Sequence, residues 1–526
     1  MRDFNVPGRS AAMAANGMAA TSHPLATLFA LDVLRGGGNA VDAALAAVAM
    51  LSVVEPAMTG IGGDCFVLYS KKGAPPLALN GSGRAPAKAR VEWYTERGID
   101  GIAVQTPHAV TIPGAVDAWC TLHREHATRP LAELLEPAAR VAEEGYIVTP
   151  RVALDWRRNA AKLRDPMTAR LFLLDGKAPE AGGRMRNPPL AATLRRIGAE
   201  GREAFYDGPV MHDVLSRLQE LGGLHEADDF AAQHSDWVEP IHAPYRGHDV
   251  YECPPNGQGL AALLILRILE GYRLAGDSFG EADRLHLLAE ATKAAYAVRD
   301  AHICDPEHVP VDVARFLSDD WAEAARGGIR LDQVQPGTFW GSSEYRDTTY
   351  FCVVDRDGNA VSFINSLFSA FGSGIVAPES GILLHNRGTG FRTTPGHPNA
   401  IAPRKRPLHT IIPGMLCRDG LAVMPFGVMG GQYQAVGHAH FLHRMLDRGM
   451  DPQQAAEAPR IFAFQGTLQI EQALPDPLIA DLMGRGHRIE RLEVPIGGSQ
   501  AIWIDHQRGL LIGGSEPRKD GLALGY

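Results

Sequence analysis

The chain has 526 residues, of which 45% are hydrophobic, and it carries a formal net charge of −9 at pH 7. This length predicts two to four domains, or one or two large ones, with enough apolar residues to bury a large core. The longest basic block is "PRKR" at Pro403–Arg406, so the charge pattern favours neither nucleic acid nor an anionic membrane surface as a partner.

The cysteines and the start of the chain indicate a reducing compartment. Polar residues interrupt every apolar run near the N-terminus, so no secretory signal is predicted. The most apolar segment, Val41–Val54, is too short to span a bilayer and contains Asp42, which predicts a buried Ala-rich helix. We therefore expect a cytoplasmic protein. The cysteines have no C-x-x-C spacing, which is typical of neither a disulfide framework nor a zinc site, and we expect reduced core thiols at Cys65, Cys120, Cys253, Cys304, Cys352 and Cys417.

The first predicted elements are two helices and a hairpin. Residues 24–56 predict two helices with "RGGGN" between them, whose glycines can cap the first helix while Asn39 or Asp42 opens the second. A phosphate-binding loop is disfavoured, because no strand precedes these glycines and no lysine follows at the required position. Residues 64–82 hold two apolar runs around "KKGAPP" and predict a β-hairpin.

Residues 115–300 predict mainly helices, because segments such as "ADRLHLLAEATKAAYAVRDAH" repeat apolar residues at helical spacing. Residues 308–346 lack such a pattern and are rich in Gly, Pro, Ser and charge, which predicts a loop or linker. From Thr348 onward, short apolar runs alternate with turns. We therefore expect a structural junction between Asp347 and Thr348.

The segment "TTYFCVVDRDGNAVSFINS" predicts a second hairpin with two possible registers. Either a two-residue turn "DG" or a three-residue loop "RDG", with Gly358 left-handed, fits the sequence. The three-residue register, which we favour, places Thr348 opposite Ser366, about 5 Å away at the backbone. The two-residue register would place Leu367 opposite Thr348.

Thr348 permits two interpretations. A threonine hydroxyl is a weak nucleophile at neutral pH, but a threonine at the start of a chain can use its own α-amine as the base. An α-amine titrates near ~7.7–8.0, close to working pH. Cleavage between Asp347 and Thr348 would create such a threonine. Otherwise Thr348 simply begins a strand, as β-branched residues commonly do.

Several long motifs follow one another along the chain, among them "GGNAVDAALA", "VEPAMTGIGGDCFVLY", "YECPPNGQGLAALLILRILEGY", "DTTYFCVVDRDGNAVS", "RPLHTIIP", "VMGGQYQ" and "GGSEPRKDGLALGY". Together they resemble the γ-glutamyltransferase family of N-terminal-nucleophile hydrolases. The resemblance implies an α+β fold, a four-layer αββα sandwich formed jointly by two subunits cut from one proenzyme. The large, mostly helical subunit would be residues 1–347. The small, strand-rich subunit would be residues 348–526, beginning with the nucleophile Thr348.

The resemblance also implies catalytic residues. Thr348 would first cleave the bond after Asp347 and then attack a substrate amide, with its α-amine carrying the proton and water resolving the acyl-enzyme. Ser366 matches a second family threonine that hydrogen-bonds the nucleophile. Gly430 and Gly431 match the oxyanion-hole glycines, although without the resemblance they would suggest only a tight turn.

The substrate pocket departs from the family pattern. Family members that hold a γ-glutamyl head clamp its α-carboxylate with an arginine, where this chain has Ser82, with Arg84 two residues later. A glutamine that reads the α-amine becomes Arg387, and an asparagine becomes Phe368. A cation at this place favours a carboxylate and disfavours an ammonium group.

Three positions remain open in this pocket. Arg387 could instead be a structural ion-pair former, and the carboxylate role could belong to Arg84, to Arg387 or to neither. Two family serines become His409 and Thr410. His409 has no carboxylate partner visible in the sequence, so we interpret it as a packing or hydrogen-bonding residue.

The departures resemble an atypical branch that includes oxamate amidohydrolases, cephalosporin acylases and glutathione-hydrolase-like proteins. We expect an amidohydrolase that cleaves a small carboxylate-bearing amide, with oxamate as the best candidate. The alternative is a glutathione hydrolase or γ-glutamyltransferase acting on γ-glutamyl compounds, and a weaker one is an inactive binding or scaffold relative. We expect no metal and no organic cofactor. The expected partners are the small-molecule amide and the two subunits, as a heterodimer or a dimer of heterodimers, with no nucleic acid and no membrane.

Overall fold

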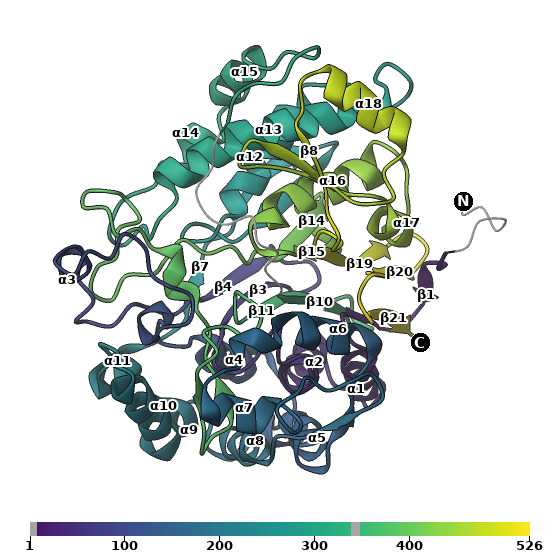
Figure 1. Cartoon of the computed structure of the whole chain (residues 1–526). Helices are drawn as coiled ribbons and strands as arrows, with labels where there is room; N and C mark the ends of the chain where they lie inside the picture. The colour runs from purple at the N-terminus through teal and green to yellow at the C-terminus, as the bar shows by residue number, and fades with distance from the viewer. Residues whose placement is uncertain (1–7, 338–347) are drawn as a thin grey trace.

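Two seven-stranded antiparallel sheets stacked face to face form the centre of the protein, and helices cover the outer face of each (Figure 1). This computed structural model describes residues 8–337 and 348–526. The first sheet has the strand order β21-β2-β10-β11-β3-β4-β7, and the second has the order β1-β20-β19-β15-β14-β9-β8. The arrangement confirms the predicted αββα sandwich.

The strands are short, and both sheets draw on segments before and after position 348. The first sheet consists of β2 (Met18–Thr21), β3 (Asp64–Ser70), β4 (Leu77–Gly81), β7 (Asp236–Val238), β10 (Thr349–Val354), β11 (Ala360–Ser366) and β21 (Leu522–Gly525). The second consists of β1 (Ala12–Ala14), β8 (Ile241–Tyr245), β9 (His248–Glu252), β14 (Gly414–Arg418), β15 (Leu421–Met429), β19 (Gly498–Asp505) and β20 (Leu510–Ser515). Neither sheet is therefore complete without both parts of the chain.

The helices form the two outer layers. Those gathered beneath the first sheet in Figure 1 include α1 (Pro24–Arg35), α2 (Ala40–Val54), α4 (Ala115–His126), α5 (Leu131–Glu144), α6 (Pro150–Asn159), α7 (Pro166–Phe172) and α8 (Pro188–Glu200), with α9 (Glu203–Tyr206), α10 (Gly208–Glu220) and α11 (Ala227–Ala232) beside them. Those above the second sheet include α12 (Gly259–Glu270), α13 (Glu281–His302), α16 (Gln434–Leu446), α17 (Pro452–Glu457) and α18 (Asp476–Gly484). A small sheet of β16 (Ile461–Phe464), β17 (Thr467–Ile470) and β18 (Ile489–Arg491) joins the second group.

Alternating side chains on β10 show how one strand serves two hydrophobic layers. Tyr350 and Cys352 point into the apolar core between the two sheets. Phe351 and Val353 point into the core between the first sheet and the helices that cover it. This follows from the strand period of two, which sends successive side chains to opposite faces. Thr348 shares its parity with Tyr350, so its side chain also belongs to the space between the sheets.

The predicted N-terminal elements are confirmed. Gly36 caps α1, and Asn39 and Asp42 form a capping box at the start of α2, each side chain accepting a backbone N–H of the other. All residues of α2 are buried, and no helix among the described residues is both long and apolar enough to cross a membrane. The predicted hairpin is the β3–β4 pair. The six cysteines are free and buried.

Two regions differ from the sequence-based expectation. The predicted loop at 308–346 is wrong in part, because it contains α14 (Val313–Phe316) and α15 (Asp319–Gly327). Ser318 caps α15 by accepting the Trp321 N–H, a local signal that the poor overall apolar pattern concealed. Within the mainly helical stretch 115–300, β7 and β9 pair with the distant strands β4 and β14, and β8 and β9 form a hairpin with each other.

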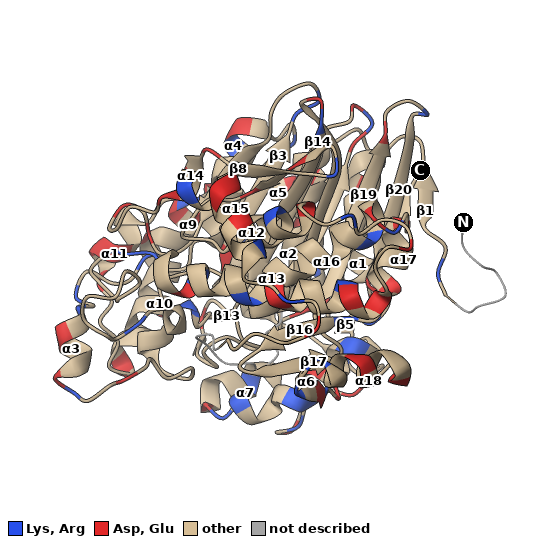
Figure 2. Cartoon of the chain, turned by 90° about the horizontal axis from the view of Figure 1, so that it is seen from above, with Lys and Arg blue, Asp and Glu red and all other residues tan. Residues whose placement is uncertain are grey.

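Basic and acidic residues are mixed along the fold. Figure 2 shows Lys and Arg positions interspersed with Asp and Glu positions along the ribbon, rather than collected in one stripe. This distribution agrees with the composition, which has 51 basic and 60 acidic residues.

Gly427 sets how closely the two sheets approach beside the start of β10. A Cβ atom on Gly427 would lie 2.4–2.7 Å from the ring of Tyr350, which is fully buried between the sheets. The Tyr350 hydroxyl hydrogen-bonds the Ser362 hydroxyl at 2.8 Å, which fixes the ring in place. The start of β10 therefore packs directly on the end of β15.

We expect Gly427→Ala to destabilise the protein by about 1–3 kcal/mol, because an added methyl group overpacks a core that cannot yield. The matched control is Gly484→Ala at the end of α18, where a Cβ would meet no atom within 4 Å. Denaturant unfolding monitored by circular dichroism measures both changes. Equal midpoints for the two variants would contradict the steric role of Gly427.

Candidate active site

Thr348 and Ser366 face each other at the open end of the β10–β11 hairpin, where β10 begins and β11 ends. Thr349 pairs with Asn365 and Val354 pairs with Ala360, which is the three-residue register, with Gly358 left-handed at φ 82°. The Thr348 Oγ1 and Ser366 Oγ atoms lie 3.0 Å apart, and both residues are buried. The register prediction is confirmed, and it brings the two hydroxyl groups into hydrogen-bond contact. Asp347, the predicted residue before the cut, lies outside the described residues.

Ser366 is held in place by the turn that follows it. Its Oγ accepts the N–H of Phe368 at 2.8 Å, so the hydroxyl can still donate its hydrogen to Thr348 Oγ1. Phe368 has φ 76°, a left-handed conformation that is uncommon outside glycine. The bend turns the chain sharply away from β11 directly after the hydroxyl pair.

The Gly430-Gly431 turn ends β15, the strand of the opposite sheet that packs on the start of β10. Both residues have positive φ angles, 124° and 57°. A Cβ on Gly430 would lie 3.0 Å from Cα of Gly497, so this turn also needs glycine for space. Consecutive glycines leave backbone N–H groups that a reacting oxyanion could approach closely.

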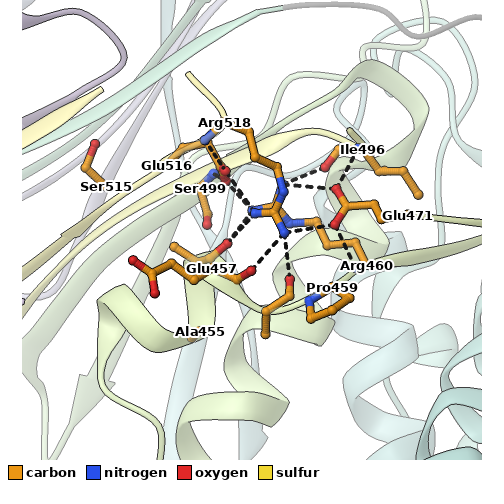
Figure 3. A network of polar contacts seen from close by, with 12 residues as sticks. Ala455, Glu457, Pro459, Arg460, Glu471, Ile496, Ser499, Ser515, Glu516 and Arg518 are labelled. Atoms are coloured by element: carbon orange, nitrogen blue, oxygen red, sulfur yellow. Dashed lines mark hydrogen bonds and ion pairs between the residues drawn. The ribbon is translucent and has the colours of Figure 1, made fainter. Parts of the chain in front are cut away.

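A buried ion-pair network supports the other side of this turn (Figure 3). Arg460 pairs with Glu516 and Glu471, and Arg518 donates to the same two carboxylates at 3.0 and 2.9 Å. Glu471 and Glu516 in turn accept the N–H groups of Ile496 and Ser499. Burial alone would raise the pKa of Glu516, but Arg460 and Arg518 outweigh it and hold the pKa below its usual value. The network fixes the chain on both sides of Gly497, against which Gly430 packs.

Gln258 joins the glycine turn to the loop that contains Thr410. Its Nε2 donates to the carbonyl groups of Gly431 at 3.0 Å and Thr410 at 2.7 Å. Arg299 on α13 donates to the side-chain oxygens of both Gln258 and Gln432. Sequence reasoning missed Gln258 and Arg299, since a buried amide and a helical arginine carry no catalytic signal of their own.

Arg387 contacts Phe368, the residue whose N–H donates to the Ser366 hydroxyl. It is fully buried, its Nη1 donates to Thr410 Oγ1 at 2.9 Å, and its guanidinium carbon stacks 3.9 Å from the Phe368 ring centroid. A continuous series of contacts therefore runs from the hydroxyl pair to the glycine turn, and we call its members the nucleophile ring: Thr348, Ser366, Phe368, Arg387, Thr410, Gln258 and Gly431.

The expectation that His409 has no carboxylate partner is wrong. Asp64, at the start of β3, pairs with Ser366 in the sheet, and its Oδ2 lies 3.0 Å from His409 Nε2 and 3.5 Å from His385 Nδ1. The other oxygen accepts the N–H groups of Gly83 and Gly114. The partner was hidden because 345 residues separate Asp64 from His409 in the sequence.

Burial and charge decide which members of this cluster are ionised. Burial would raise the pKa of Asp64, but His385, His409 and Arg387 outweigh it and lower the pKa to about 2. Burial, with Arg387 nearby, lowers the pKa of His409 to about 3. The His409 Nδ1 accepts the Ile411 N–H, so Nε2 carries the hydrogen and donates to Asp64. Ionised Asp64 thus holds a neutral His409, which positions the neighbouring Thr410.

Ser82 and Arg84 have different surroundings. The Ser82 Oγ accepts a hydrogen from Asn256 at 3.0 Å, and the Asn256 carbonyl accepts the His409 N–H, so Ser82 connects to the His409 loop. Arg84 instead pairs with Asp236 at 3.2 Å and Glu307 at 3.5 Å. Arg387 therefore belongs to the nucleophile ring, whereas Arg84 is engaged in ion pairs with Asp236 and Glu307 outside it.

A sequence model described as gamma-glutamyltranspeptidase matches residues 26–526. The chain belongs to this family. It is 37% identical to the glutathione hydrolase-like YwrD proenzyme of Bacillus subtilis (strain 168), with 97% of this chain and 98% of that protein covered. It is 35% identical to the oxamate amidohydrolase proenzyme of Klebsiella pneumoniae, covering 98% of this chain and 100% of that protein. The crystal structure of cephalosporin acylase from Bacillus halodurans matches with a TM-score of 0.93 at 38% identity, covering 100% of this chain and 99% of that one.

The γ-glutamyltranspeptidase family has the N-terminal-nucleophile fold and comprises amidohydrolases and transferases. The relatives named as proenzymes match this chain over almost its whole length. The fold and the reaction class are therefore those of the family.

We expect His409→Gln to flatten the pH dependence of stability. Unfolded His409 binds a proton near its ordinary pKa of 6.5, whereas the folded residue does so only near pH 3, so unfolding takes up a proton between these values. Stability contributed by neutral His409 is thus present above about pH 6.5 and is lost as pH falls. Replacing this titrating group should reduce the slope of the unfolding free energy against pH by about 1.4 kcal/mol per pH unit between pH 4 and 6.

Denaturant unfolding at several pH values measures this slope. Gln can still donate to Asp64, so the variant removes the titrating group without leaving the carboxylate unpaired. His212→Gln, at an exposed position on α10, is the control and should leave the slope unchanged. Identical slopes for wild type and His409→Gln would show that His409 is not held neutral.

Proposed function

We propose that this γ-glutamyltranspeptidase-family protein is an autoprocessing amidohydrolase with Thr348 as its nucleophile. The observation that carries the proposal is the 3.0 Å contact between the Thr348 and Ser366 hydroxyls, buried at the head of β10. In the proposed first step, Thr348 Oγ attacks the Asp347 carbonyl and the peptide bond to the Thr348 nitrogen breaks, which gives an ester. Water hydrolyses the ester, leaving a carboxylate on Asp347 and a free α-amine on Thr348.

In the proposed second reaction, the free α-amine takes the Thr348 hydroxyl proton while Oγ attacks the substrate amide carbon. The N–H groups of the Gly430-Gly431 turn would stabilise the negative oxygen, a contribution worth roughly 10²–10³ in rate for one donor. The α-amine then gives the proton to the leaving amine. Water attacks the acyl-enzyme, releasing the acid and restoring Thr348.

Intact mass of purified wild type and Thr348→Ala tests the nucleophile. We expect the wild type to give two chains, residues 1–347 and 348–526, and Thr348→Ala to remain one chain, because the attacking oxygen is gone. Thr348→Ser is the matched control, since it keeps the hydroxyl and should still be cut. An uncut wild type, or a Thr348→Ala that is cut at the same bond, would overturn the assignment.

The proposed substrate is a small amide that carries a carboxylate close to the scissile bond, with oxamate as the best candidate. Support comes from Arg387, a buried cation in contact with Phe368 and Thr410 of the nucleophile ring. A guanidinium pairs well with a carboxylate through charge-assisted hydrogen bonds and disfavours the ammonium group of a γ-glutamyl head. The full-length similarity to an oxamate amidohydrolase proenzyme agrees with this choice.

Ammonia release from oxamate, compared with amine release from a γ-glutamyl anilide, tests the substrate class. We expect oxamate to be hydrolysed, and Arg387→Met to lower kcat/KM by about 10–100-fold, because a hydrogen bond to a charged group is worth about 1.5–3 kcal/mol. Arg84→Met is the control for folded, self-cleaved protein and should keep most activity.

Other outcomes of these assays distinguish the alternative substrate classes and the arginine that binds the carboxylate. Turnover of the anilide without oxamate would favour a glutathione hydrolase or γ-glutamyltransferase. A larger loss in Arg84→Met than in Arg387→Met would assign the carboxylate to Arg84. Self-cleaved protein that hydrolyses neither compound would reject this substrate class while leaving the nucleophile intact.

A further inference from the structure

A second buried polar cluster lies outside the nucleophile ring. It consists of His286 and Glu290, one turn apart on α13, and His487, which follows α18. One potential ligand atom from each residue lies within 4.8 Å of the others. His286 is fully buried, Glu290 is 2% exposed and His487 is 6% exposed. Two imidazoles and a carboxylate converging in this way are a donor set that suits zinc.

The two histidine rings are oriented as metal ligands are. His286 Nε2 lies 2.7 Å from the Arg330 carbonyl, which can only accept, so Nε2 carries the hydrogen and Nδ1 of the neutral ring presents a lone pair. That Nδ1 lies 2.8 Å from His487 Nε2, with the rings nearly perpendicular. Metal-binding histidines usually donate their other N–H to a carbonyl or carboxylate in the way that His286 does.

Glu290 is held by outer contacts and retains acceptor capacity. Lys293 Nζ donates to one carboxylate oxygen at 2.6 Å, and the Gln335 N–H donates to the other at 3.0 Å. Each carboxylate oxygen has a further lone pair, so these bonds orient the group without saturating it.

The backbone explains how His487 reaches α13. Gly486 is left-handed at φ 96°, and the His487 N–H donates to the Leu482 carbonyl at 3.1 Å, which closes the end of α18. The turn aims His487 at the face of α13 that holds His286 and Glu290, which are four residues apart and therefore neighbours on one helix face. A cavity of about 320 Å³, lined by Lys293 and His487 among others, adjoins the cluster on the His487 side.

We infer that His286 Nδ1, His487 Nε2 and Glu290 bind a divalent transition-metal ion, with Zn²⁺ as the best match. Zn–N and Zn–O bonds of about 2.0–2.2 Å place neighbouring ligand atoms roughly 3.3 Å apart on a tetrahedral ion, so only small movements are needed. The hard ions Ca²⁺ and Mg²⁺ prefer all-oxygen sites and fit two imidazoles poorly.

The ion would join two parts of the chain. His286 and Glu290 lie before position 348 and His487 lies after it, so a bound ion would link the two pieces that the proposed cleavage creates. Binding itself does not depend on cleavage. The site should therefore take up metal in wild type and in Thr348→Ala alike, which separates failure of this inference from failure of the proposed function.

The test uses chelator-treated full-length protein titrated with Co²⁺, whose visible absorption is strong in four-coordinate nitrogen and oxygen sites, followed by competition with Zn²⁺. We expect wild type to bind one more equivalent than Glu290→Gln or His487→Ala, or to bind at least tenfold more tightly. His302→Ala, an exposed residue of the same helix, is the matched control and should bind like wild type. Zn²⁺ should also raise the thermal midpoint of wild type but not of His487→Ala.

Glu290→Gln keeps the shape of the side chain and one of its two acceptor oxygens, so it tests the site even if His487→Ala does not fold. No Co²⁺ absorption in wild type would overturn the inference. Equal stoichiometry and affinity in wild type, Glu290→Gln and His487→Ala would overturn it as well, because any bound metal would then lie on other histidines.

Discussion

The register of the β10–β11 hairpin is the constraint on which the candidate site depends. Both faces of β10 are buried, with Tyr350 and Cys352 between the sheets and Phe351 and Val353 against the helices. A slip of one residue would exchange these two faces, so packing on both sides specifies the register strongly. The same register sets the Thr348 hydroxyl opposite Ser366. Hydrophobic packing along the strand therefore fixes the geometry of a polar pair at its end.

Stacking of the two sheets supplies the rest of the site from a different direction. The Gly430-Gly431 turn belongs to the second sheet, and its place relative to β10 depends on the close contact of Gly427 with Tyr350. Behind it, the Arg460 and Arg518 network fixes the chain around Gly497. Buried groups joined by many hydrogen bonds have few alternative arrangements, which makes such a turn rigid before any substrate arrives. Strands before and after position 348 contribute to both sheets, so the site forms only where both parts of the chain meet.

Local patterns in the sequence predicted much of the fold and only part of the site. The capping box of α2, the β3–β4 hairpin and the three-residue loop at Gly358 depend on neighbouring residues, and all were predictable. The Asp64–His409 pair was not, because its members are 345 residues apart and each alone is compatible with a core residue. Strand β7 was missed for the same reason, since its partner β4 is distant in sequence. The β8–β9 hairpin is local, and its Arg246-Gly247 turn is a sequence signal that was overlooked. Helix α15 has a clear capping signal in Ser318, but it was missed because its apolar face is short.

Under the proposed function, the charges around the nucleophile ring would limit which substrates it can accept. Asp64 is the ionised carboxylate of its cluster and already accepts hydrogen bonds from Gly83, Gly114 and His409, while His409 stays neutral. Arg387 lies between Phe368 and Thr410, so under the proposed function a substrate group bound beside these two residues would meet a guanidinium. Two like charges about 4 Å apart cost about 4 kcal/mol at an effective dielectric constant of 20. An ammonium group there would be disfavoured by that order, and a carboxylate favoured by a similar amount. The overall fold is shared by relatives with different names, so the difference in substrate must come from a few such side chains rather than from the sandwich.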